Sequence, residues 1–366
     1  MLDRLFGLFS HDIAIDLGTA NTLVLVHGKG IVVREPSVVA RHSKTKAVLA
    51  IGSEAKRMIG KTPQAIEAIR PLRNGVIADF DAAEAMLSHY IALVHETHGI
   101  IPKIPRPRVV VGIPSGVTEV ERRAVQEVAL SAGARAAYLI EEPMAAAIGA
   151  GLPIEEPRGH LIVDIGGGTT EIAVVSLGGI VLNRSIRIAG DELDEAVQSF
   201  IRLKFGLLLG ISSAEEVKIA VGSAYPFEES TLEETGESTG LSRRNAGLLQ
   251  IVVRGRDLES GLPKSLKVNS IEIREALAPV IRQIIEEIKD TIEETPPELV
   301  ADILEHGITM AGGSSLLRGI DKLLAEETKM PVWVTDDPQT AVVRGCGILL
   351  GDERLLSKVR VRGSLR

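Results

Sequence analysis

The stretch that most constrains the fold is residues 161–175, where two runs of β-forming residues flank three consecutive glycines. This pattern predicts a strand, a tight turn and a second strand. The glycines at 166–168 carry no Cβ, so backbone N–H groups of the turn can approach a phosphate closely. Asp164 ends the first run, where a carboxylate can hold a phosphate-bound Mg²⁺, usually through water. By itself, this stretch fits an ordinary glycine-rich hairpin equally well.

The same design occurs a second time, in residues 12–26. An apolar strand ends in Asp16, a turn with Gly18 and Thr19 follows, and a second strand leaves. The two aspartates are separated by about one domain length. One hairpin in each half predicts two related domains that close on a nucleotide from both sides. This arrangement resembles the actin, Hsp70 and sugar-kinase ATPase superfamily.

Composition sets the limits of these hypotheses. A chain of 366 residues is long enough for two or more domains with ample core. The net charge of −8, with dispersed basic residues, gives no indication of nucleic-acid binding. A single cysteine, Cys346, excludes an internal disulfide and fits a reducing cytosol. No apolar run reaches the length of a transmembrane helix, and residues 1–10 are too short for a signal peptide.

Two further segments carry residues suited to a nucleotide site. A strand at 137–140 leads into Glu141 and Glu142, and carboxylates at the carboxyl end of a sheet strand lie where ligands of α/β domains bind. Alternatively, both are solvated residues favoured at a helix start by the dipole. A strand at 308–311 runs into Gly312 and Gly313, which suits close contact with the adenosine half of a nucleotide.

The remaining elements follow from periodicity and capping signals. A polar, acidic segment at 225–245 is interpreted as a mobile surface insertion. Residues 249–254 and 265–268 predict a hairpin through Gly261. Helices are predicted at 81–95, from Thr118 to about 131, from Gly190, at 213–218, at 269–294 with a kink at Pro279, and from about 335.

Two segments have membrane-binding character. Residues 1–10 place Leu2, Leu5, Phe6 and Phe9 at helical spacing, which suits a membrane interface; a disordered or packed N-terminus is the alternative. In residues 97–108, three prolines exclude a helix. The isoleucines of this second segment form an apolar tip suited to anionic lipid, or they pack on their own domain. The tip and its basic flank comprise Ile100, Ile101, Ile104, Lys103, Arg106 and Arg108.

Four segments together resemble the MreB family, the bacterial actins that govern rod shape: residues 16–22, 141–149, 164–171 and 188–192. The resemblance runs from about residue 12 to about residue 351. It implies that Asp16 and Asp164 serve Mg²⁺ and that Glu142 positions the attacking water. It also implies phosphate contacts from Gly18, Thr19, Ala20, Asn21, Gly166, Gly167, Gly168 and Thr169. Ribose and adenine would be approached by Glu215, Glu216, Val217 and Lys218, and the adenosine pocket completed by Gly312, Gly313, Ser314 and Ser315.

The chain departs from the family pattern in two places. Ser314 stands where a third glycine is usual, which puts nucleotide affinity in question, and the 225–245 insertion is longer than the family norm. The resemblance implies an α/β fold of the actin type, with two related domains around a nucleotide cleft and a small subdomain on each. Domain I would comprise residues 1–151 and about 335–366, and domain II residues 152–334, so that the crossing forms a hinge.

Three functions remain open from the sequence. The first is a cytoskeletal ATPase that binds ATP and Mg²⁺ and assembles with itself, in paired antiparallel strands by resemblance. Its filaments would lie on the inner face of the cytoplasmic membrane with cell-wall elongation proteins. The second is an Hsp70-like chaperone, which needs a substrate domain that the segment after about residue 351 is too short to supply. The third is a sugar or acetate kinase with the same ATPase core.

Overall fold

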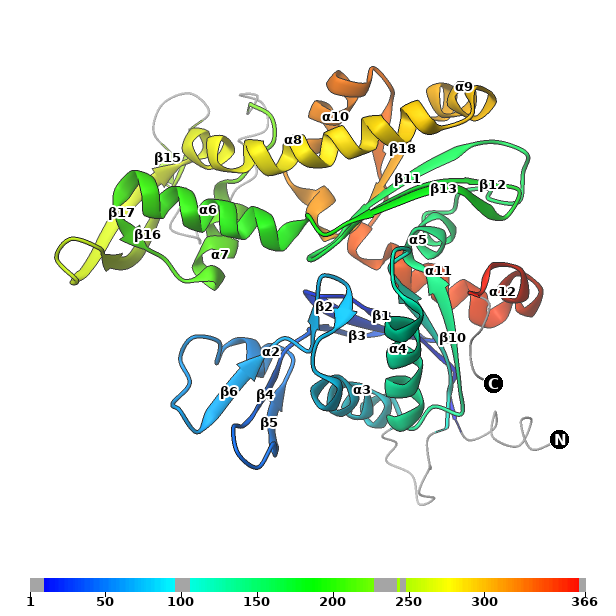
Figure 1. The fold of residues 1–366 in the computed structure, drawn as a ribbon, viewed down its shortest axis with the longest axis horizontal. Coiled ribbons are helices and arrows are strands. Elements are labelled where there is room, and N and C mark those ends of the chain that lie inside the picture. Colours follow the sequence, from blue (N-terminus) through cyan, green and yellow to red (C-terminus); the bar gives the residue numbers. More distant parts are fainter. Residues whose placement is uncertain (1–9, 96–105, 227–241, 244–247, 362–366) are drawn as a thin grey trace.

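The structure is a computed structural model that describes residues 10–95, 106–226, 242–243 and 248–361. Two five-stranded sheets organise it, one in each of two domains (Figure 1). The domain I sheet has the order β10-β9-β1-β2-β3, formed by β1 (Ile13–Leu17), β2 (Asn21–Val26), β3 (Gly30–Pro36), β9 (Arg108–Ile113) and β10 (Ala136–Glu141). The domain II sheet has the order β13-β12-β11-β18-β19, formed by β11 (His160–Ile165), β12 (Thr170–Ser176), β13 (Gly179–Ile186), β18 (Ile308–Ala311) and β19 (Val332–Val334).

The two sheets repeat one plan, as the paired hairpins predicted. In domain I, β1 pairs antiparallel with β2 and parallel with β9. In domain II, β11 pairs antiparallel with β12 and parallel with β18. Every residue of β11 and β12 is buried, which explains their nearly continuous apolar sequence. The actin-like architecture predicted from sequence is therefore confirmed at the level of sheet topology.

Helices cover both faces of each sheet. In domain I, α3 (Phe80–His95) and α4 (Glu119–Ser131) share a core with β1, β2, β9 and β10. The Thr118 capping box predicted from sequence opens α4. In domain II, α6 (Gly190–Phe205) and α8 (Ser270–Glu294) bury their apolar faces over the sheet, together with α9 (Pro297–His306) and α10 (Ile320–Thr328).

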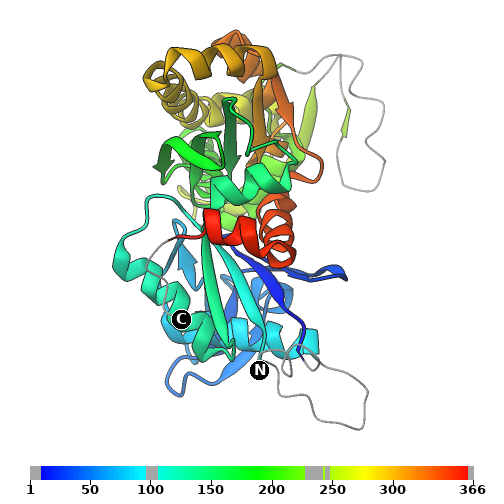
Figure 2. The same ribbon diagram turned by 90° about the vertical axis from the view of Figure 1, so that its right-hand side faces the viewer.

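The domains meet through two crossed helices, α5 (Glu142–Gly149) and α11 (Ala341–Gly351). α5 packs on β11 and β12, whereas α11 packs on β1 and β9, so the pair lies between the two sheets (Figure 2). Glycine is required at their crossing. An added Cβ at Gly149 would lie 1.8 Å from the Ala341 carbonyl oxygen, and one at Gly345 would lie 1.8 Å from the Ala145 carbonyl oxygen. The two backbones are therefore in direct contact at the centre of the molecule.

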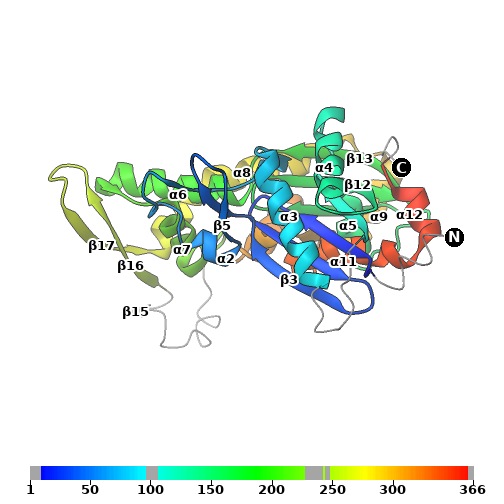
Figure 3. The same ribbon diagram turned by 90° about the horizontal axis from the view of Figure 1, so that it is seen from below.

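A small subdomain extends each domain on the side of the cleft. In domain I it consists of α2 (Ser53–Lys56) beside the sheet β5-β4-β6, formed by β4 (Val39–His42), β5 (Val48–Ile51) and β6 (Ile66–Ile69). In domain II it consists of α7 (Ile211–Val221), β14 (Leu207–Leu208), β15 (Ser242–Arg243), β16 (Leu249–Asp257) and β17 (Pro263–Asn269). Figure 3 shows the β16–β17 hairpin projecting at the end opposite the termini. β15 is a short strand that the predicted polar insertion did not anticipate.

The C-terminal helix begins later than predicted. The sequence pattern indicated a helix from about 335, but a 3₁₀ turn at Pro338–Thr340 precedes α11, which starts at Ala341. Pro338 fixes its own φ and restricts the residue before it, which prevents an earlier start. A second helix, α12 (Glu353–Val359), follows, and the Asp352 side chain caps it by accepting from the Leu355 N–H at 2.9 Å.

The predicted membrane residues Leu2, Leu5, Phe6, Phe9, Ile100, Ile101, Ile104 and Lys103 lie outside the described part of the chain. Arg108, predicted to flank the loop tip, lies in the described part. It begins β9, and its guanidinium donates to Asp12 at 2.7 Å and to Glu353 at 2.9 Å, so carboxylates of this chain already neutralise it. Among the described helices, none is long and apolar enough to cross a membrane.

Candidate functional site

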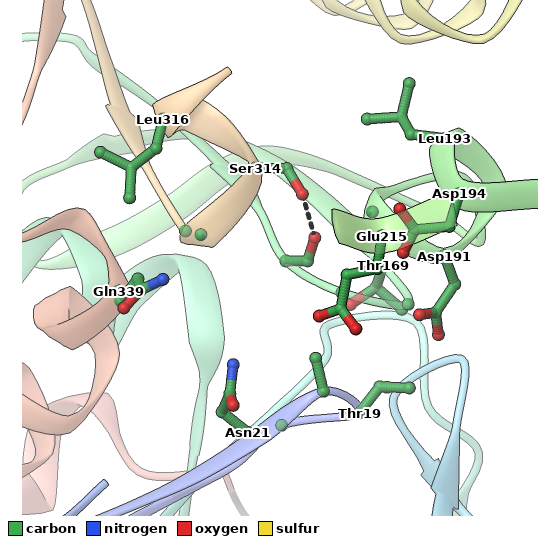
Figure 4. Close-up of a pocket in the computed structure, with 18 of the residues that line it drawn as sticks. Thr19, Asn21, Thr169, Asp191, Leu193, Asp194, Glu215, Ser314, Leu316 and Gln339 are labelled. Atoms are coloured by element: carbon green, nitrogen blue, oxygen red, sulfur yellow. Dashed lines mark hydrogen bonds between the residues drawn. The ribbon is translucent and has the colours of Figure 1, made fainter. Parts of the chain in front are cut away.

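A cavity of about 670 Å³ lies between the two domains and is lined by both glycine-containing hairpins. The β1–β2 turn contributes Gly18 to Asn21, and the β11–β12 turn contributes Gly166 to Thr169. Figure 4 shows Thr19 and Asn21 on one side of this space, facing Thr169 and Ser314 on the other. Two segments far apart in sequence therefore form one site, as the repeated pattern predicted.

The two hairpins are in direct contact. An added Cβ at Gly168 would lie 2.7 Å from the Thr19 Oγ1, and one at Gly167 would lie 2.6 Å from the Ala20 Cβ. Only glycine permits this approach. The Thr19 Oγ1 also accepts a hydrogen bond from the Gly75 N–H at 2.9 Å. A ligand between the turns would therefore touch both domains at once.

Neighbouring elements fix the β11–β12 turn from behind. The N-terminus of α6 donates from the Gly190 N–H to the Gly166 carbonyl at 3.2 Å and from the Asp191 N–H to the Gly167 carbonyl at 2.7 Å. The Ser314 Oγ donates to the same Gly166 carbonyl at 2.7 Å (Figure 4). Ser314, which by resemblance stands where a third glycine is usual, thus adds a hydrogen bond that stabilises the β11–β12 turn.

Three of the carboxylates that line the cavity, Asp16, Glu142 and Asp164, lie close enough to influence one another's charge. Burial raises the pKa of Asp16 to about 8, with a further contribution from the Asp164 charge, and burial raises the pKa of Asp164 to about 7. The pKa of Glu142 is raised well above its usual range by burial first and then by the charge of Glu171. Such a set of acids is stabilised in its charged form by a cation.

The donor set fits a metal that is held partly by other ligands. Among the described residues, no group of three or more His, Cys, Asp or Glu side chains could hold an ion by itself. Mg²⁺ keeps several waters and is commonly held by one or two carboxylates together with substrate phosphates. Asp16 and Asp164, each at the end of a strand beside a phosphate-type turn, match this mode of binding.

Ion pairs connect the two sides of the cleft at its rim. Lys56 of α2 lies 2.8 Å from the Glu215 carboxylate of α7, and Arg70 lies 2.7 Å from the Asp191 carboxylate of α6. The burial of Arg70 opposes an increase of its pKa, but Asp191 outweighs this effect and raises it. These two pairs join the domain I and domain II sides of the opening.

The structure brings most of the predicted site residues to the cavity, but three lie elsewhere. Glu216 is exposed, Val217 is buried in the domain II core, and the buried Ser315 Oγ donates to the Gly312 carbonyl at 2.6 Å. Lys218 reaches the cavity, but its Nζ lies 2.8 Å from the Asp194 carboxylate and donates to the Gly190 carbonyl at 2.9 Å.

Other lining residues were given no site role by sequence. Asp191 had a signal, because it lies in the resembling segment at 188–192. The others had none, because their neighbours are distant in sequence; they include Lys56, Arg70, Asp194, Arg318 and Gln339.

A sequence model described as MreB/Mbl protein matches residues 10–358. The chain belongs to the MreB/Mbl family. It is 49% identical over 351 residues to the cell shape-determining protein MreB of Escherichia coli K12, covering 95% of each chain. It is 46% identical over 351 residues to the cell shape-determining protein Mbl of Bacillus subtilis 168, covering 96% of this chain and 99% of that one.

Solved structures of MreB proteins agree with the fold. The crystal structure of MreB5 of Spiroplasma citri bound to AMPPNP matches with a TM-score of 0.83 and 38% identity, covering 94% of this chain and 97% of that one. The ADP-bound form of the same protein matches with a TM-score of 0.84 and 37% identity, covering 96% and 98%. A MamK double helical filament, 23% identical with a TM-score of 0.74 over 94% and 99% of the two chains, supports the fold alone.

These MreB/Mbl relatives support a cytoskeletal role for the chain, in preference to the chaperone and small-molecule kinase hypotheses.

Proposed function

We propose that the chain is a cytoskeletal ATPase that binds Mg-ATP between its domains and polymerises into membrane-associated filaments organising cell-wall elongation and rod shape. One observation carries the nucleotide part: two phosphate-type hairpins touch across a cavity that also holds Asp16, Glu142 and Asp164. Support also comes from the MreB5 structures with AMPPNP and ADP and from the cell-shape role named for the relatives.

In the proposed site, different residues of the cavity lining would bind different parts of the nucleotide. Backbone N–H groups of both turns would bind the phosphates, because glycine-containing turns present N–H groups without obstruction. Gly312, Gly313 and Ser314 would contact the adenosine half, and Glu215 and Lys218 the ribose side. Glu216, Val217 and Ser315, also predicted for this part, would act only by supporting it. Mg²⁺, held by Asp16 and Asp164 through water, would supply charge neutralisation at the phosphates.

Glu142 is the residue proposed to orient and activate the attacking water. It lines the cavity at the start of α5, where its carboxyl group can bind a water beside the phosphates. Burial raises its pKa, and a cation bound beside Asp16 and Asp164 would favour the charged form that accepts a proton. The Cys346 thiol, buried nearby, has a pKa raised well above its usual range by burial and then by the charge of Asp16, so it stays protonated and takes no part.

We further propose that the hinge between domains lies at the α5–α11 crossing, with domain I formed by residues 1–151 and 335–366 and domain II by residues 152–334. The chain passes between domains at each of these two helices. Nucleotide held by both hairpins would favour the closed arrangement over the open one. A closed subunit with a head-to-tail contact whose rotation does not close would generate a filament, with paired antiparallel strands by resemblance to the family.

Sedimentation and light scattering across a concentration series test this proposal. With Mg-ATP, we expect assembly above a critical concentration, and with ADP or without nucleotide a higher threshold. A protein that binds ATP well yet remains monomeric or dimeric at every concentration, with and without lipid, would contradict the proposal.

Membrane attachment is proposed from the apolar residues at 1–10 and 100–104 alone. Each inserted side chain contributes about 1.5–3 kcal/mol at most, so a monomer would bind weakly, whereas a filament would bind firmly through many copies. Replacing both apolar sets with serine should abolish co-sedimentation of filaments with anionic liposomes. Unchanged pelleting of that variant would contradict the membrane role.

A further inference from the structure

Glu171 is a buried carboxylate to which the proposed chemistry assigns no task. It lies on β12 directly opposite Asp164 of β11 and is 1% exposed. Its Oε1 accepts from the Ser185 Oγ at 2.5 Å, and its Oε2 accepts from the Ser115 N–H at 3.1 Å. Buried carboxylates are costly unless such partners satisfy them, so this position is specified by its hydrogen bonds.

The two partners of Glu171 come from different domains. Ser185 belongs to β13 of the domain II sheet, whereas Ser115 follows β9 of the domain I sheet. The Ser115 N–H is therefore a domain I donor bound to a domain II carboxylate. A second contact accompanies it, because an added Cβ at Gly116 would lie 3.2 Å from the Ser185 Cβ.

We call the contacts of Ser115 and Gly116 with Glu171 and Ser185 the interdomain seam. This seam continues to the turns of the two glycine-containing hairpins. At Gly75 an added Cβ would lie 2.5 Å from the Pro114 Cγ and 3.0 Å from the Thr169 Cγ2, so the turn at Gly75 is wedged between the two. The same Gly75 donates its N–H to the Thr19 Oγ1. A shift of the Ser115 loop relative to domain II would therefore displace residues that contact both hairpins.

The seam also lies within reach of the hydrolytic residues. Glu171 faces Asp164 across the β11–β12 ladder, and after burial its charge is the largest influence on the pKa of Glu142. Glu171 is absent from the cavity lining, so a direct contact with nucleotide is not part of its role. Glu171 can therefore influence Asp164 and Glu142 without lining the cavity itself.

We propose that Glu171 is a positioning residue that couples domain closure to water activation, by holding the Ser115 backbone of domain I against β12 and β13 of domain II. This inference rests on the proposed ATPase function. Closure would bring the Ser115 N–H onto the carboxylate, and the contact would hold β12, with Asp164 opposite it on β11, in the position that hydrolysis requires. Loss of the carboxylate would uncouple closure from turnover while leaving the nucleotide pocket intact.

The kinetic test compares Glu171→Ala with Glu171→Gln. Glu171→Ala removes both hydrogen bonds and should lower kcat by about tenfold, as expected for the loss of two hydrogen bonds, with KM and nucleotide affinity within about threefold of wild type. Glu171→Gln keeps the size and an acceptor for the Ser115 N–H, and its amide can donate to Ser185, so it should recover most of kcat.

The matched control is Asp302→Ala. The Asp302 Oδ2 accepts from the Gly159 N–H at 2.7 Å, which is the same kind of bond but within domain II and away from the cavity. It should change neither kcat nor closure. An equal loss of kcat in Asp302→Ala would reduce the Glu171 effect to general destabilisation and overturn the inference.

Closure itself can be followed by energy transfer between two fluorescent labels, one at Glu127→Cys of α4 and one at Glu286→Cys of α8, since both positions are exposed. The labels would react only at these two sites, because the single native cysteine, Cys346, is buried. With Mg-AMPPNP, the labelled protein should shift its transfer efficiency. Adding Glu171→Ala should abolish most of the shift although AMPPNP still binds, and Glu171→Gln should restore it.

The outcomes distinguish failure of the Glu171 coupling proposal from failure of the proposed ATPase function. Wild-type kcat and a full shift in Glu171→Ala would overturn the coupling role while leaving the ATPase proposal intact. Failure of the wild-type protein to bind or hydrolyse ATP would instead overturn the proposed function. Should Glu171→Ala not fold, Glu171→Asp shortens the side chain by one methylene, so that it cannot keep both the Ser115 and the Ser185 hydrogen bonds, and its unchanged kcat and closure would equally overturn the inference.

Discussion

The two hairpins share one design but are held in place differently. In domain I, one residue binds two backbone carbonyls of the β1–β2 turn, because Ser37 donates its Oγ to the Gly18 carbonyl at 2.6 Å and its N–H to the Ala20 carbonyl at 3.0 Å. In domain II, the β11–β12 turn is fixed by the start of α6 and by Ser314.

The difference shows which elements are displaced when a bound ligand moves each turn. A shift of the β1–β2 turn is transmitted to Ser37, which lies between β3 of the sheet and β4 of the small subdomain. A shift of the β11–β12 turn is transmitted to α6, which packs on α7 and α8. The domain I hairpin is therefore connected to its small subdomain directly along the chain, and the domain II hairpin through the packing of α6. The comparison can be tested by substitutions in each hairpin and its surroundings.

The largest effect on ATP hydrolysis is expected from substitution of Glu142, which lines the cavity together with both hairpins. Glu142→Ala should reduce single-turnover ATP hydrolysis by about 10²–10⁴-fold, the usual contribution of a positioned base, while nucleotide affinity is retained. Glu141→Ala is the matched control, since Glu141 is adjacent but absent from the cavity lining, and it should keep near-normal turnover. Hydrolysis by Glu142→Ala at the wild-type rate would show that the assigned role is wrong.

The next effect compares the two strand-terminal aspartates. Asp16→Ala and Asp164→Ala should each weaken Mg-nucleotide binding by about 10–100-fold, as for residues that hold a metal through water. In EDTA the variants should differ little from wild type, because metal-dependent affinity is what they lose. Titration calorimetry with and without Mg²⁺ measures both. A loss confined to one aspartate would show that the hairpins are not equivalent in metal binding.

Much of this site could be predicted from sequence because its signals are local. A strand, an acidic residue and a glycine turn are contiguous in both hairpins, and Glu142 directly follows a strand. The repetition of the hairpin in each half then predicted that both bind one nucleotide, and the structure brings the two hairpins into contact.

The remaining features depend on contacts between residues far apart in sequence, for which a sequence pattern carries no signal. Lys56 with Glu215 and Ser115 with Glu171 are such pairs. The ion pairs of Arg108 were missed for the same reason, since only the fold brings Asp12 and Glu353 to its guanidinium. Val217 was wrongly expected at the pocket because a four-residue segment of helix presents only one face to the cavity.

A smaller effect is expected at the hydrogen bonds that fix each turn. Ser37 is fully buried, so Ser37→Ala leaves the Gly18 carbonyl unsatisfied and should lower the free energy of unfolding by about 1–3 kcal/mol. Ser314→Ala should cost about 1 kcal/mol or less, because Gly166 keeps its bond from the Gly190 N–H. Urea unfolding measures both, with Ser43→Ala, at an exposed hydrogen bond, as the control. The reverse ranking would contradict the comparison of the two turns.

The smallest effect is expected at the rim. Lys56→Ala and Arg70→Ala each remove one partly exposed ion pair, worth about 1 kcal/mol or less, and should speed nucleotide release by about fivefold at most. Lys289→Ala breaks an ion pair with Glu327 inside domain II and should leave release unchanged. Stopped-flow release of a fluorescent ATP analogue at low salt gives the rates. Equal rates in all three variants would exclude a contribution of the rim pairs to retention.

The most direct test of the account is hydrogen exchange of both turns with and without Mg-AMPPNP. If one nucleotide is held by both hairpins, the amides of residues 18–21 and 166–169 should be protected together and with the same dependence on nucleotide concentration. Protection of one turn alone, or of neither, at saturating Mg-AMPPNP would contradict the claim that the two domains grip one nucleotide.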